Sequence, residues 1–275
     1  MLDVRQRKWL WGPWGVMRFE ALRSLTFWRV MVWFSLTFFP VILLSVAISR
    51  ISGRIVADVP PGDLAFGVAS LIFILLPQVV TILSLLLWAT PVVHSELEGQ
   101  TWVYAVVRPG GRRSVLLGKY VVAVVWTISA TCVAATCLIP AIYRLTGEHT
   151  IRIWAVTCLL NVLAAFAYGS AFVLIGTLLQ RRAMVAGFLF ALIVEALLSL
   201  VPAVISQFTV SFRLRSLLIQ CLDITLTETD SIKTFFNLDH PPIVHFSGLL
   251  AYVAITLGFA LWRVQSSQFA WQSEL

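Results

Sequence analysis

Charged residues are scarce in this sequence. Asp, Glu, Lys and Arg make up only 12% of its 275 residues, whereas 59% are hydrophobic, and the mean hydropathy is +0.91. A soluble domain devotes about a quarter of its residues to charge, because its surface must be covered with polar groups. The composition therefore excludes a soluble globular protein and indicates a protein that resides in a membrane.

Sequence motifs for ATP hydrolysis, metal binding and disulfide formation are also missing. Gly118 and Lys119 are followed by Tyr120, so no G-x-x-x-x-G-K-[ST] phosphate-binding loop occurs. The four cysteines form no C-x-x-C pair, and three of them lie inside apolar runs. We therefore expect no catalytic residues, no metal site and no cofactor bound by this chain itself.

The charge that is present is mainly positive, with a net charge of +7. Nucleic-acid binding requires basic residues gathered on an exposed domain, and the sequence shows no such cluster. The positive charge instead fits anionic lipid headgroups and cytoplasmic loops. We expect membrane lipids as partners and no nucleic acid.

Six stretches are long and apolar enough to cross a bilayer as helices, which takes about 20 residues each. The second carries no charge and contains Pro77, where we expect a kink. The sequence thus predicts an all-α membrane protein, with a single six-helix transmembrane domain over residues 1–275. The predicted spans are Val30–Ser49, Ala65–Val93, Val115–Pro140, Ile153–Leu179, Ala183–Ser206 and Ile243–Trp262.

Lys and Arg are distributed unequally between the two sides of these spans. If the amino terminus is cytoplasmic, most of the basic residues also lie in the cytoplasm. Cytoplasmic loops retain positive charge, so this orientation is favoured. We therefore expect a multi-pass protein of the cell membrane with both termini in the cytoplasm.

Two further segments are predicted to contact the membrane without crossing it. Residues 1–29 have an apolar stripe at helical spacing with Glu20 off the stripe, which predicts an amphipathic helix in the interface, or else a frayed tail anchored by tryptophans. Residues 207–242 form an extracytoplasmic segment that folds against the membrane, where Asp230 caps a short helix. The stripe consists of Val16, Phe19, Leu22 and Thr26.

The loop of residues 94–113, between the second and third spans, predicts a short cytoplasmic helix. Ser95 and Glu98 have the spacing of a capping box, in which each side chain satisfies a backbone donor at a helix start. Pro109, Gly110 and Gly111 then stop the helix. A rigid helix held between two spans is suited to receive force from a soluble partner.

This loop resembles that of the permease subunits of ABC-2 type ATP-binding-cassette transporters. An acidic residue, Gly-Thr, an apolar stretch, a proline, an arginine and Gly-Lys follow one another in that family. Gln100 departs from the pattern, because the family usually has glycine there. Together with six spans and the amino-terminal helix, the resemblance covers nearly the whole chain. The matching residues are Glu98, Gly99, Thr101, Pro109, Arg112, Gly118 and Lys119.

The resemblance implies two kinds of partner subunit for this chain. Two such permeases, identical or paralogous, pair around a path, and two separate cytoplasmic ATPase subunits bind ATP and Mg and dock on the loop helices. ATP hydrolysis then drives export of a substrate that the sequence does not identify. Docking is expected at Glu96, Glu98, Gly99, Thr101, Trp102 and Pro109, and anchoring at lipid phosphates at Arg112, Arg113 and Lys119.

Glu195 is the only acid well inside a predicted span. A charge in the bilayer costs about 2.5–3.5 kcal/mol on insertion scales, so this carboxyl must face protein, water or a partner, or be neutral. It either lines the path or the dimer interface, or is a hydrogen-bonded carboxyl that only packs helices. His240 and His245, five residues apart, are interpreted as structural rather than metal-binding.

Three other functions stay open. An ATP-independent channel or secondary carrier would usually show several buried polar or broken-helix positions. An intramembrane hydrolase would need a nucleophile with a histidine, and the predicted membrane interiors contain no histidine. A protein that works with an ATPase in assembly or regulation, without export, would have the same sequence signature as the permease.

Overall fold

A computed structural model describes residues 13–52, 61–98, 111–179, 182–197, 209–222 and 241–266. Almost all of these residues are helical, and no strand occurs among them. The prediction of an all-helical protein is therefore confirmed for the described part of the chain.

Five of the described helical stretches are long and apolar enough to cross a membrane. Four correspond closely to predicted spans. The stretch Ile139–Leu178 contains nearly all of the predicted span Ile153–Leu179 and begins with a further short helix, because the residues between the third and fourth predicted spans are also helical. Together they indicate a multi-pass membrane protein. The stretches are Phe27–Arg50, Gly62–Val92, Gly111–Cys137, Ile139–Leu178 and Pro242–Ser266.

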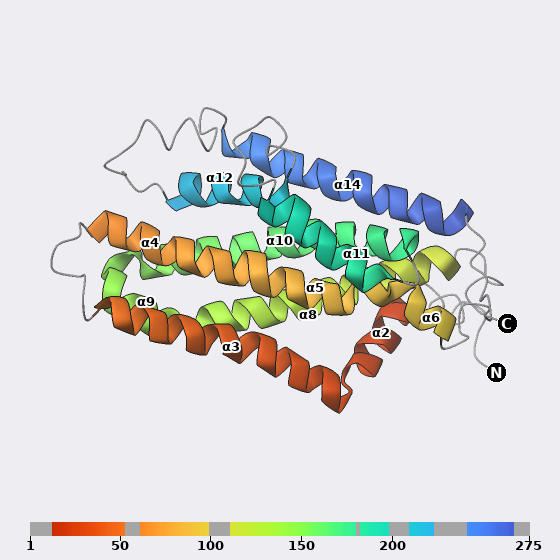
Figure 1. Ribbon diagram of the computed structural model, residues 1–275, viewed down its shortest axis with the longest axis horizontal. Helices are drawn as coiled ribbons and strands as arrows, with labels where there is room; N and C mark the ends of the chain where they lie inside the picture. Colours follow the sequence, from red (N-terminus) through yellow and green to blue (C-terminus); the bar gives the residue numbers. More distant parts are fainter. Residues whose placement is uncertain are drawn as a thin grey trace.

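The helices form one elongated bundle in which most of them run along the long axis (Figure 1). One end holds α6 (His94–Glu98) and the start of α8 (Gly111–Cys137), and we call it the α6 end. The opposite end holds α9 (Ile139–Thr146) and is called the α9 end. The last turn of α14 (Pro242–Ser266) also lies at the α6 end, where it contacts the first turn of α8.

The central helix is α10 (Thr150–Leu178), which contacts helices on all sides. Its buried face is rich in alanine and glycine, and small residues let helix backbones approach closely in membranes. Gly176 shows how closely, because a Cβ atom there would lie 2.3 Å from the carbonyl oxygen of Thr90. The helices against α10 are α4 (Pro61–Phe73), α5 (Thr81–Trp88), α8, α11 (Ala183–Phe190), α12 (Val210–Leu222) and α14.

Two π-helical turns interrupt the helices. The first, Ile74–Val80, joins α4 to α5 and contains Pro77, where the sequence predicts a kink. Proline has no N–H and its ring displaces a carbonyl of the preceding turn, so the helix widens. After Pro77, the Thr81 N–H and hydroxyl both donate to the Leu76 carbonyl. The second π-helical turn, Ala191–Leu197, continues α11.

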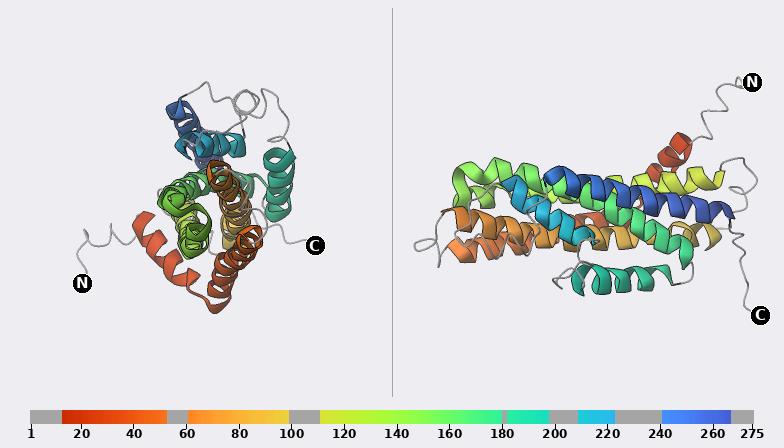
Figure 2. Two further views of the ribbon diagram at one scale, coloured as in Figure 1. Left: turned by 90° about the vertical axis from the view of Figure 1, so that its left-hand side faces the viewer. Right: turned by 90° about the horizontal axis from the view of Figure 1, so that it is seen from above.

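The predicted fifth span is described in part. α11 and its π-helical turn are described as far as Leu197, and the rest of that span, to Ser206, lies outside the described residues. The following described helix, α12, belongs to the predicted extracytoplasmic segment of residues 207–242. α12 packs between α10 and α14, with Leu214 and Ser216 fully buried. It starts beside the end of the α11 stretch and runs toward the α9 end (Figures 1 and 2). The predicted helix capped by Asp230 lies outside the described residues.

The amino-terminal helix α2 (Pro13–Ser24) belongs to the segment predicted to lie in the membrane interface, and it turns one face to the bundle. It packs on α8 with Glu20 and Ser24 buried, whereas Phe19 and Leu22 are each 63% exposed. Phe19 and Leu22 belong to the predicted apolar stripe, and an interfacial helix turns such a stripe toward lipid. The polar side chains on the other face of α2 turn toward protein. Ser24 accordingly accepts a hydrogen bond from Trp126 of α8, at 2.6 Å.

Candidate functional site

The chain leaves the bundle for the predicted coupling loop through a sharp turn. α5 ends at Trp88, and a 3₁₀ turn, Thr90–Val92, contains Pro91 with non-helical backbone angles. Proline cannot continue the helix, so the chain changes direction there. α6 then begins at His94, one residue before the predicted cap Ser95.

Lys119 of α8 ties α6 to the bundle. Its ammonium lies 2.5 Å from the Glu96 carboxylate, and the exposed fraction is below one tenth for both side chains. The same nitrogen donates to the Ser95 hydroxyl at 2.8 Å and to the Val92 carbonyl at 3.3 Å. All three N–H groups of the ammonium thus have a partner. The first turn of α6 is therefore fixed to α8 by a buried, hydrogen-bonded ion pair.

Three residues at this junction make contacts that the sequence did not predict. Lys119 does not reach lipid phosphates, because its ammonium points inward to Glu96. Glu96 is buried in this pair and presents no carboxylate for docking. Ser95 lies inside α6 rather than before it, and its hydroxyl accepts from Lys119 and donates to the Val92 carbonyl. Burying either charge alone would be costly, which explains why the two side chains meet.

Arg112 and Arg113 contact the end of α14. Arg112 donates to the Gln265 carbonyl at 3.2 Å, and Arg113 donates to the Gln265 side-chain oxygen at 2.5 Å. Arg113 is exposed at the α6 end of the bundle. The contact joins α8 to the last helix, and the role of both arginines at lipid phosphates stays a prediction.

The remaining predicted docking residues fall outside what the structure describes. This holds for Gly99, Thr101, Trp102 and Pro109, and for the side chain of Glu98. The helix predicted from Ser95 to Val107 is therefore described only as far as Glu98.

Glu195 caps a helix inside the bundle. The backbone N–H groups of Val210 and Ser211, the first two residues of α12, donate to its two carboxyl oxygens at 3.3 and 2.9 Å. The Tyr168 hydroxyl of α10 donates to the same group at 3.2 Å and also hydrogen-bonds the Ser211 hydroxyl. The start of a helix carries unsatisfied N–H groups and partial positive charge, which an acidic side chain stabilises.

A cavity of about 230 Å³ lies beside Glu195. Its wall is mostly apolar, and both π-helical turns contribute to it, with Gln78 from one and Glu195 from the other. The Gln78 amide nitrogen is buried without a hydrogen-bond partner in the described part of the chain. Turns of this kind are frequent at functional sites. The cavity thus combines an apolar wall with an amide donor and a carboxyl group.

The sequence interpretation missed Gln78 and the partner of Lys119. Gln78 could have been noticed, because it is an amide next to Pro77 inside a predicted span without charge. Glu96 and Lys119 are 23 residues apart, and no local spacing rule connects them.

Of the two histidines interpreted as structural, the structure describes one. His245 is buried in the first turn of α14, and His240 lies outside the described residues. No group of His, Cys, Asp or Glu side chains within the described ranges has a metal-binding arrangement.

Comparison with known proteins does not add to this description. No family model matches the chain, and no curated protein is significantly similar to it.

Proposed function

We propose that this chain is the membrane-spanning subunit of an ABC-2 type transporter, which couples ATP hydrolysis by a separate ATPase to export. The observation that carries the proposal is the buried ion pair between Glu96 and Lys119. It links the start of the loop helix to both neighbouring spans, because α6 follows α5 and Lys119 belongs to α8. Force applied to the loop would then move the two spans together.

The six-span topology of this proposal requires that two shorter helices together form one of the membrane crossings, which we call the interrupted crossing. Five described stretches are long enough to span the membrane. α11 starts at the α6 end, and α12 continues toward the α9 end (Figure 1), so the two would together form the remaining crossing. An even number of crossings leaves both termini on the same side. A helix can start at membrane depth where protein groups satisfy its free backbone N–H groups. Glu195 does this for the start of α12 by accepting the Ser211 N–H.

The cavity beside Glu195 is our candidate for part of the transport path. Its side chains come from the second span and from the interrupted crossing, and several of them, including Val79 and Phe188, are exposed on the single chain. A second permease, identical or paralogous, would cover this exposed side. The apolar wall favours a substrate with a large apolar part.

A secondary carrier is the second candidate, and the interrupted crossing favours it. Carriers place substrate sites at broken helices whose half-helix starts face polar groups, and α12 starts in this way at Glu195. Purified protein in liposomes separates the two functions. Substrate flux without any ATPase would support the carrier and contradict the permease.

Changing Glu98 and Gly99 together tests the coupling role of the loop. We expect Glu98→Lys with Gly99→Leu to reduce ATP hydrolysis by the co-reconstituted ATPase to the basal rate of that ATPase, because the docking surface is lost. The measurement is phosphate release in proteoliposomes containing both proteins.

The matched control for this experiment is Glu148→Lys, which changes an exposed acid at the α9 end. It should leave the stimulation intact. Full stimulation by the Glu98 and Gly99 double variant, with normal folding, would contradict the coupling assignment.

A further inference from the structure

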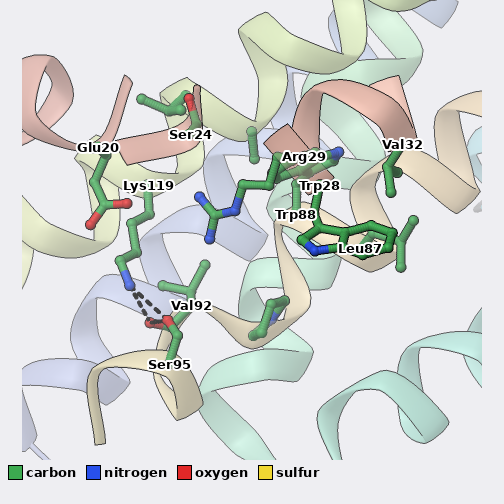
Figure 3. Close-up of a pocket in the computed structure, with 13 residues that line it drawn as sticks. Glu20, Ser24, Trp28, Arg29, Val32, Leu87, Trp88, Val92, Ser95 and Lys119 are labelled. Carbon is green, nitrogen blue, oxygen red and sulfur yellow. Dashed lines mark hydrogen bonds between the residues drawn. The ribbon is translucent and has the colours of Figure 1, made fainter. Parts of the chain in front are cut away.

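A second cavity of about 230 Å³ lies near the α6 end, between α2, α3 (Phe27–Ser52), α5, α6 and α8. Figure 3 shows the side chains around it. Arg29 of α3 points into the cavity toward Lys119 and Glu20, and Trp28 and Trp88 form part of the opposite wall.

The depth of this cavity follows from the spans that surround it. Candidate spans begin at Phe27 and Gly111 and end at Val92. Arg29 is two residues from the first of these limits, and Val92 itself lines the cavity. The cavity therefore lies at a boundary of the apolar layer, where phospholipid headgroups are located.

Among the described residues, Arg29 is the cation of this cavity that makes no ion pair. Lys119 is neutralised by Glu96 at 2.5 Å. The Arg29 guanidinium contacts the Trp88 ring at 5.2 Å from its centroid, and within the described residues it makes no hydrogen bond. A half-buried guanidinium has five donors in a fork that matches two oxygens of a phosphate.

The aromatic wall holds this arrangement in place. Trp88 stacks on Trp126, which in turn contacts Trp33 edge-on. The Trp126 and Trp33 indole nitrogens donate to Ser24 and Ser129. The guanidinium is therefore held by a rigid ring system before a ligand binds, which reduces the entropy cost of binding.

An apolar surface continues from the cavity along α3. Trp28 lines the cavity and is exposed, and Met31, Phe34 and Phe38 follow at helical spacing, also exposed. This stripe can accommodate acyl chains. A ligand that satisfies the guanidinium and covers the stripe has a phosphate group attached to long apolar chains.

We propose that the cavity binds the phosphate of a membrane glycerophospholipid, with Arg29 as its main ligand and the acyl chains along Trp28 to Phe38. The site would keep one lipid bound between the amino-terminal helix and the two spans that flank the loop. The inference depends on the chain being a membrane protein and is independent of the proposed transport function.

Native mass spectrometry of the full-length protein in detergent tests the site. The probes are phosphatidylglycerol, a diacylglycerol with the same chains but no phosphate, and inorganic phosphate. We expect phosphatidylglycerol to bind at least about tenfold more tightly than the diacylglycerol, and Arg29→Gln to remove this difference. Inorganic phosphate at millimolar concentration should not displace the lipid.

Arg50→Gln is the matched control, because Arg50 is exposed at the other end of the same helix. It should leave lipid binding unchanged. Arg29→Lys keeps the charge without the fork and should bind roughly threefold more weakly than the unchanged protein, so it serves as the test if Arg29→Gln does not fold. Equal lipid affinity in the Arg29 variants and Arg50→Gln would overturn the proposal, and so would displacement by inorganic phosphate alone.

Discussion

Replacing Lys119 by methionine is expected to lower the melting temperature of the purified protein by roughly 6–20 °C. The change leaves the buried Glu96 carboxylate without its cation, and breaking a buried ion pair in this way costs about 3–5 kcal/mol. For a chain of this size, each kcal/mol corresponds to about 2–4 °C. Size-exclusion chromatography after heating in detergent measures the loss of the folded peak.

A second substitution shows whether the pair itself is responsible. Adding Glu96→Leu to Lys119→Met removes both buried charges, and we expect most of the stability to return, because an apolar pair can replace a buried ion pair. Arg113→Met is the matched control on the same helix. Arg113 is exposed, and exposed polar contacts of this kind contribute at most about 1 kcal/mol. A Lys119→Met protein as stable as the control would contradict the buried pair.

Replacing Glu195 by leucine is expected to release the start of α12. The N–H groups of Val210 and Ser211 would lose their acceptor in a buried environment, at a cost of about 1–3 kcal/mol for each donor. The half-buried thiol of Cys221, in the last turn of α12, reports this release. We expect its labelling by a maleimide to accelerate at least about tenfold, in a background with the other three cysteines changed to alanine.

Two variants separate the roles of the Glu195 carboxyl. Tyr168→Phe removes one donor to Glu195 and keeps both backbone hydrogen bonds, so Cys221 should stay protected. Glu195→Gln keeps an acceptor of the same size and should fold with a smaller loss of stability. If Glu195→Gln folds and transports fully, the carboxyl has a structural role between helices and no role in the transport path. If Glu195→Leu leaves Cys221 protected, Glu195 does not hold α12.

The helical spans were predictable because they depend on one local property, a long run without charge. The uncharged sequence up to Val93 predicted the second span, and the structure has a candidate span at Gly62–Val92. The first span was predicted from Val30 to Ser49 and is found at Phe27–Arg50. Such runs require no knowledge of their neighbours.

The packing of α2 on α8 and the position of α12 could not be derived in the same way. An apolar stripe indicates which face of a helix is buried only if water lies opposite it. On α2, Phe19 is exposed and Glu20 is buried, the reverse of that rule. α12 belongs to residues 207–242, which were predicted as an extracytoplasmic segment because they form the longest stretch between two spans. Its start is held by Glu195 from another helix. Both outcomes depend on contacts between distant segments.

The side of the membrane on which the loop of residues 94–113 lies is the most direct test of the proposed coupling. Thr101→Cys places one thiol in this loop, and Arg144→Cys places one in α9. Each variant is made in a background with all four native cysteines changed to alanine. With a membrane-impermeant maleimide on intact cells, we expect labelling of Arg144→Cys alone, and labelling of Thr101→Cys only after permeabilisation. Labelling of Thr101→Cys in intact cells would place the loop away from ATP and its ATPase, and would contradict the proposal.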